Sequence, residues 1–100
     1  YLQFFANRGA GTKRLMRYAA EIWGVKPDFE HPERTVQAGI NATREYFESL
    51  GMPSTLGDLG LREADIQVMC DKCTGAGSIT FPGIVPIGRA GAEEIFRLCL

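Results

Sequence analysis

Two cysteines three residues apart, Cys70 and Cys73, have the spacing of a metal-binding or redox pair. A structural zinc site needs four ligands, and this pair supplies two. The other soft ligands, Cys99 and His31, lie far away and have no paired spacing. A reactive pair needs a helix N-terminus to stabilise the thiolate, whereas this one falls near the C-terminal end of an expected helix. We therefore interpret both as packing residues, because buried free cysteine behaves as a small hydrophobic residue.

Residues 70–77 read Cys-x-x-Cys-x-Gly-x-Gly, which resembles one zinc-binding repeat of the DnaJ-type chaperones. This resemblance keeps an alternative function open, a free-standing helical interaction module that binds zinc through Cys70 and Cys73. Residues 9–13 hint at a phosphate loop, but a P-loop needs longer glycine spacing and a preceding strand. His31 precedes a proline at a helix start, so we expect it to cap that helix or to lie in solvent rather than to act in catalysis. The pair Glu93-Glu94 is interpreted as solvated charge.

The elements that position these residues are helices. Apolar residues recur at intervals of three and four, which predicts an all-α chain of about five helices. The expected ranges are 1–6, 13–23, 32–50, 62–73 and 91–99, with an irregular loop over 79–87. Thr12 is expected to cap the second helix. Gly39 lies inside the longest helix, where glycine costs about 1 kcal/mol relative to alanine, and a close helix neighbour is one explanation for a glycine there.

Residues 47–60, Phe-Glu-Ser-Leu-Gly-Met-Pro-Ser-Thr-Leu-Gly-Asp-Leu-Gly, end one helix and begin a short new turn. Gly51 stands where a helix commonly ends in a left-handed residue. Thr55 and Asp58 have the spacing of a capping pair. The side chains expected to face inward after this turn are Leu56 and Leu59.

This stretch resembles a signature near the C-terminus of the iron-containing alcohol dehydrogenases, most closely in the butanol-dehydrogenase branch. The flanking residues 17–25 and 61–66 agree in the same order, so the resemblance extends over most of the chain. It implies a partial helical bundle like the C-terminal domain of that family, the helical domain of the dehydroquinate synthase-like fold. The chain begins with Tyr1, inside an apolar segment. We therefore expect residues 1–100 to form a single helical domain, a C-terminal fragment of a longer two-domain enzyme.

The resemblance implies that the parent protein is an NAD(P)-dependent alcohol dehydrogenase that interconverts alcohols and aldehydes. In that family an N-terminal domain binds NAD or NADP, and a divalent metal, iron or zinc, is held in the cleft by one aspartate and three histidines. None of these motifs matches this chain, so we expect it to hold no catalytic, cofactor-binding or metal-ligating residue and to be inactive alone. One match places Cys73 and Thr74 in a loop that approaches the substrate cleft in some relatives.

The implied partners are the missing N-terminal dinucleotide-binding domain, the remaining helices of the parent, a small alcohol or aldehyde, and further copies in a homo-oligomer. A net charge of −1 gives no electrostatic signature for nucleic acid. No apolar run approaches the roughly 20 residues that span a bilayer. Three cysteines, an odd number, favour reduced thiols and a cytoplasmic location. The apolar residues Tyr1, Leu2, Phe4 and Phe5 are expected to lack partners here, and to cause self-association or binding to the remainder of the parent domain.

Overall fold

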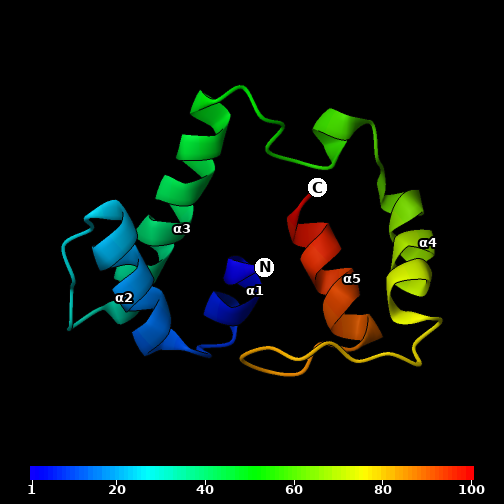
Figure 1. Cartoon of the computed structure of the whole chain (residues 1–100), viewed down its shortest axis with the longest axis horizontal. Coiled ribbons are helices and arrows are strands. Elements are labelled where there is room, and N and C mark those ends of the chain that lie inside the picture. Colours follow the sequence, from blue (N-terminus) through cyan, green and yellow to red (C-terminus); the bar gives the residue numbers. More distant parts are fainter. The chain divides into compact units, whose positions relative to one another are not determined.

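The computed structural model describes all residues from Tyr1 to Leu100. Its elements, labelled in Figure 1, are α1 (Leu2–Asn7), α2 (Thr12–Trp23), α3 (Pro32–Ser49), the 3₁₀ turn η1 (Gly57–Leu59), α4 (Glu63–Thr74) and α5 (Arg89–Leu98). The only β pairing is an isolated antiparallel bridge between Phe81 and Ile87. The predicted all-α class is therefore confirmed, and the longest helix lies where the apolar spacing predicted it.

The chain folds into two compact units, an N-terminal unit (Tyr1–Met52) and a C-terminal unit (Pro53–Leu100). The first contains α1, α2 and α3, and the second contains η1, α4 and α5. None of the helices combines the length and the apolar character that a membrane-spanning segment requires.

In the N-terminal unit, α2 and α3 cross in close contact at Ala19 and Gly39. A Cβ atom added at Gly39 would lie 2.5 Å from the Cβ of Ala19 and 2.9 Å from its Cα. Beyond the crossing, the Tyr18 hydroxyl lies 2.7 Å from that of Thr43 in a hydrogen bond. The close neighbour suggested for Gly39 is thus confirmed, because only a residue without a side chain lets the two backbones approach this far.

Helix α1 packs against α2 and α3, and this overturns the expectation of an unpartnered N-terminal segment. Phe4 is 2% exposed and Phe5 is fully buried. Their rings meet edge to face with centroids 5.4 Å apart. Of the apolar residues in this segment, Tyr1 remains largely exposed. The expectation was wrong because a sequence pattern does not show that residues 8–11 fold α1 back onto the two following helices.

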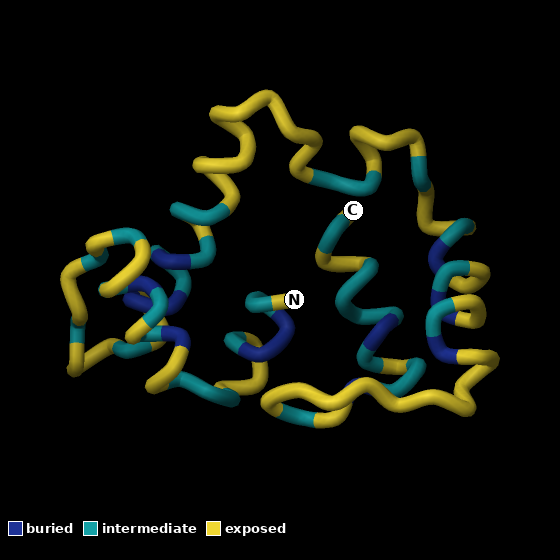
Figure 2. The backbone as a smooth tube through the Cα atoms, viewed as in Figure 1, coloured by how far each residue is buried: buried dark blue, intermediate teal, exposed yellow.

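The apolar stripe of α3 is only partly covered within the N-terminal unit. Val36 is buried, whereas Phe47 and Leu50 are exposed. Figure 2 shows this change along the helix, whose last residues are all exposed. The ring of Tyr46 still contacts Trp23 of α2, with centroids 5.4 Å apart. The part of α3 that extends beyond the end of α2 is therefore exposed within this unit.

Two predicted helix starts are shifted. Thr12 is the first residue of α2, and Gly11, in the left-handed region, occupies the cap position. The Thr12 hydroxyl instead donates to the carbonyl of Gly9, with an O–O distance of 3.3 Å. Helix α5 begins at Arg89 rather than at residue 91, because the Arg89 side chain is held by groups on α4 that the local sequence does not show.

The turn over residues 47–60 has most of the predicted geometry. Gly51 has a φ of 78°, in the left-handed region. The amide of Asp58 donates to the Thr55 hydroxyl at 3.1 Å, and the Asp58 carboxylate accepts the amide of Thr55 at 3.2 Å. The inward orientation predicted for Leu59 is wrong, since that side chain is 61% exposed. The amide of Leu56 donates to the carbonyl of Cys99 at 2.7 Å, so Leu56 alone is drawn toward the end of α5.

This capping pair predicts a pH dependence. Backbone amides of Ser54 and Thr55 donate to the Asp58 carboxylate and lower its pKa below the ordinary 3.8. Because the folded-state pKa is the lower one, the stabilisation is fully present above the unfolded-state pKa and is lost as the pH falls through the folded-state pKa. Unfolding free energies measured for the chain and for Asp58→Asn should therefore differ at neutral pH and converge in strong acid. Glu45→Gln, which removes an exposed carboxylate from α3, should show no such convergence.

Candidate functional site

The cysteine pair lies at the C-terminal end of α4, inside the C-terminal unit. Cys70 is fully buried in a cluster with Ile66 and Ala92, and Cys73 packs at the edge of this cluster. The Cys73 thiol donates to the carbonyl of Cys70, with an S–O distance of 3.6 Å. Burial raises the pKa of the Cys70 thiol, and the nearby positive charge of Arg89 only partly opposes this effect. A neutral buried thiol at this place is suited to packing rather than to nucleophilic chemistry.

Thr74, the second residue predicted to approach a substrate cleft, is fully buried. Its hydroxyl donates to the carbonyl of Cys70 at 2.6 Å and accepts the amide of Gly77 at 3.2 Å. These bonds fix the loop at the point where Gly75, left-handed with a φ of 55°, ends α4. The Thr74 hydroxyl therefore already has hydrogen-bond partners within the chain. Of the two residues predicted at the substrate cleft, only Cys73 retains exposed surface.

His31 lies at the N-cap position of α3 without a side-chain capping bond. Its Nδ1 atom is 3.5 Å from a carboxylate oxygen of Asp28, and both side chains are partly exposed. The other Asp28 oxygen accepts the amides of Glu30 and His31, so this aspartate mainly organises the loop before α3. No group of three or more histidine, cysteine or acidic residues in the chain is placed to hold a metal ion. The residues of this chain thus do not fit the metal site implied for the parent enzyme, which needs one aspartate and three histidines, whereas this chain has one histidine.

An ionic network joins α4 and α5, and it was not predicted from the sequence. Arg89 donates through Nε to Asp71 at 2.8 Å and through Nη2 to the amide oxygen of Gln67 at 2.7 Å. Hydrogen bonding to Asp71 raises the pKa of Arg89. The interpretation of Glu93 as solvated charge was wrong, because its side chain is 23% exposed and pairs with Arg97 at 2.8 Å. The spacing of residues 89, 93 and 97 is a signal that could have indicated this row of alternating charge.

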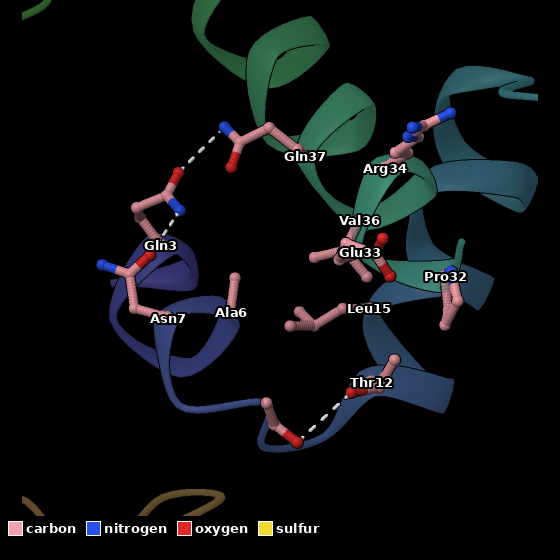
Figure 3. A pocket seen from close by; sticks show the side chains of 11 residues that line it. Gln3, Ala6, Asn7, Thr12, Leu15, Pro32, Glu33, Arg34, Val36 and Gln37 are labelled. Atoms are coloured by element: carbon pink, nitrogen blue, oxygen red, sulfur yellow. Dashed lines mark hydrogen bonds between the residues drawn. The ribbon is translucent and has the colours of Figure 1, made fainter.

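A cavity of about 530 Å³ lies in the N-terminal unit, bordered by α1, α2 and α3. In Figure 3 its apolar floor is formed by Leu15 and Val36, both buried. One wall consists of hydrogen-bonded amides: Gln37 donates to Gln3 at 2.9 Å, and Gln3 donates to Asn7 at 2.9 Å. This cavity could not be predicted from the sequence, because Gln3 and Gln37 are 34 positions apart. Its volume is within the range of small-molecule sites.

Comparison with known proteins gives three significant relatives. The chain is 30% identical over 84 residues to NADH-dependent butanol dehydrogenase A of Clostridium acetobutylicum, covering 84% of this chain and 21% of the relative. It is 28% identical over 98 residues to NADH-dependent butanol dehydrogenase B of the same organism, covering 97% and 25%. It is 35% identical over 68 residues to the NADPH-dependent aldehyde reductase YqhD of Escherichia coli, covering 66% and 17%.

This chain is related to the iron-containing alcohol dehydrogenases. The family resemblance inferred from residues 47–60 is thereby confirmed. The chain spans about a fifth to a quarter of the length of the two butanol dehydrogenases it matches. No family model and no solved structure matches it. Within the signature, Gly51 and Gly60 both have positive φ values, which explains why the motif carries glycine at these two positions.

Proposed function

We propose that this chain is the C-terminal helical part of an NAD(P)-dependent alcohol dehydrogenase that interconverts small alcohols and aldehydes. The observation that carries the proposal is the match over 84 residues to an NADH-dependent butanol dehydrogenase. A second relative named as an NADPH-dependent aldehyde reductase supports the same reaction class. The three free cysteines support a reducing, cytoplasmic location.

In this proposal the chain contributes scaffold rather than chemistry. The dinucleotide, the divalent metal and the residues that hold them belong to the remainder of the parent, together with the residues that make a homo-oligomer. Cys73 is the residue of this chain that we assign to the wall of the substrate cleft, because it is partly exposed. Thr74 holds the backbone next to Cys73 in place through the hydrogen bonds of its hydroxyl to Cys70 and Gly77.

The test compares two proteins, the isolated 100-residue chain and a longer polypeptide that contains it. The longer polypeptide should oxidise NADH or NADPH in the presence of butanal, and the isolated chain should not. A longer polypeptide without dinucleotide-dependent turnover of any short aldehyde would contradict the proposal. One zinc ion bound stoichiometrically by the purified isolated chain would instead favour the interaction-module alternative.

The role of Cys73 has its own test in the longer polypeptide. Cys73→Leu should raise the KM for butanal by several-fold with a smaller change in kcat, because the larger side chain narrows the cleft without removing a reacting group. Lys72→Leu changes the neighbouring exposed residue and is the matched control. Equal kinetic effects of the two variants would exclude Cys73 from the cleft.

A further inference from the structure

We propose that the cavity bordered by α1, α2 and α3 binds a small organic ammonium ion that carries an apolar body. This inference concerns the N-terminal unit alone and does not depend on the proposed dehydrogenase function. It rests on three features of the cavity: its apolar floor, its amide wall and a carboxylate at its edge.

The floor selects an apolar body. Leu15 is 5% exposed and Val36 is 4% exposed, and both side chains face the cavity in Figure 3. Ala6 of α1 extends this surface from the opposite side. An aromatic ring or a short aliphatic chain placed here would remove apolar surface from water on both the ligand and the protein.

The amide wall offers hydrogen-bonding groups to a ligand. The amide nitrogen of Gln37 donates to Gln3 at 2.9 Å and to Asn41 at 3.0 Å, which leaves the Gln37 oxygen available to a donor. Figure 3 shows this oxygen turned toward the open space between α1 and α3. If the side-chain amides of the wall all flip together, each presents its nitrogen where it had presented its oxygen. The wall can therefore donate to a ligand or accept from it, and it does not by itself favour a cation or an anion.

Glu33 selects the charge. It lines the cavity from the first turn of α3, where its side chain is exposed to solvent, and no hydrogen bond or ion pair joins its carboxylate to another side chain. The other charged lining residue, Arg34, extends away from the cavity in Figure 3. An ammonium group has three donors and no acceptor. It therefore complements an unpaired carboxylate at the edge of an apolar cavity, and charged hydrogen bonds are stronger than neutral ones.

The test uses 2-phenylethylammonium as probe and the isolated 100-residue chain labelled with ¹⁵N. We expect a Kd of about 1 mM, since the cavity is open to solvent and the ligand is small. Shift changes should be concentrated on the side-chain amides of Gln3 and Gln37 and on the backbone amides of Leu15 and Val36. The neutral isostere 2-phenylethanol should bind at least about tenfold more weakly, as charged hydrogen bonds contribute more.

Two variants complete the design. Glu33→Gln should weaken binding of the ammonium probe about tenfold and leave binding of 2-phenylethanol unchanged. Glu30→Gln removes an exposed carboxylate from the loop before α3 and should leave both affinities unchanged. Equal binding of the two probes, equal effects of the two variants, or shift changes centred outside the cavity would each overturn the proposal.

Discussion

Replacing Phe5 with alanine is expected to lower the free energy of unfolding by about 3–5 kcal/mol, the usual cost of truncating a fully buried phenylalanine. Phe5 is completely buried, and its ring contacts Phe4 and Tyr1, with centroids 5.4 and 4.8 Å away. Removing the ring would leave a cavity that these neighbours cannot fill without losing their own contacts. Because a domain of this size has only about 5–15 kcal/mol of stability, the loss should be visible as partial unfolding at room temperature.

Urea unfolding followed by circular dichroism gives the measurement, with Tyr1→Ala as the control. Tyr1 is 57% exposed, so its truncation should cost less than about 1 kcal/mol. The contrast distinguishes the observed packing from the expectation of an exposed N-terminal patch. If both variants were as stable as the unsubstituted chain, Phe5 would not be a core residue.

Replacing Gly39 with valine is expected to cost about 2–3 kcal/mol, at the upper end of overpacking effects in well-packed cores. The new Cβ would lie 2.5 Å from the Cβ of Ala19 and 2.9 Å from its Cα. The Cα atom belongs to the backbone of α2, so no rotamer change relieves the clash and the helices must separate. The gain in helix propensity from removing glycine, below about 1 kcal/mol, is smaller than this cost.

A double-mutant cycle tests the mechanism. Ala19→Gly removes the Cβ that the new side chain meets, so the double variant should be more stable than expected from the two single variants. In the unsubstituted chain, Ala19→Gly alone should be destabilising. Glu45→Val places the same side chain on an exposed part of α3 and should change stability by less than about 0.5 kcal/mol. Additive effects of the changes at positions 19 and 39 would show that the close crossing does not cause the loss.

The helix ends and the capping pair show where local sequence is sufficient. Gly24, Gly51 and Gly75 end or follow helices with positive φ values, and the positions of all three could be predicted because only neighbouring residues decide helix ends. The Thr55–Asp58 pair is local in the same sense. The family could also be predicted, since its signature is a continuous stretch and the comparisons bear it out. By contrast, the predicted place of Cys73 and Thr74 at a substrate cleft stays a prediction.

The sequence by itself determined the helical class, the helix ends at glycine and the family relationship, because each depends on residues that are close together in the chain. Only the tertiary structure decided that Phe4 and Phe5 are buried, that Leu59 is exposed and that Glu93 is held by Arg97. The tertiary structure also places Gln3 next to Gln37 and Glu33 at the edge of a cavity. The physical reason is that these outcomes depend on which faces of distant helices meet, and the periodicity of one helix does not specify its partner.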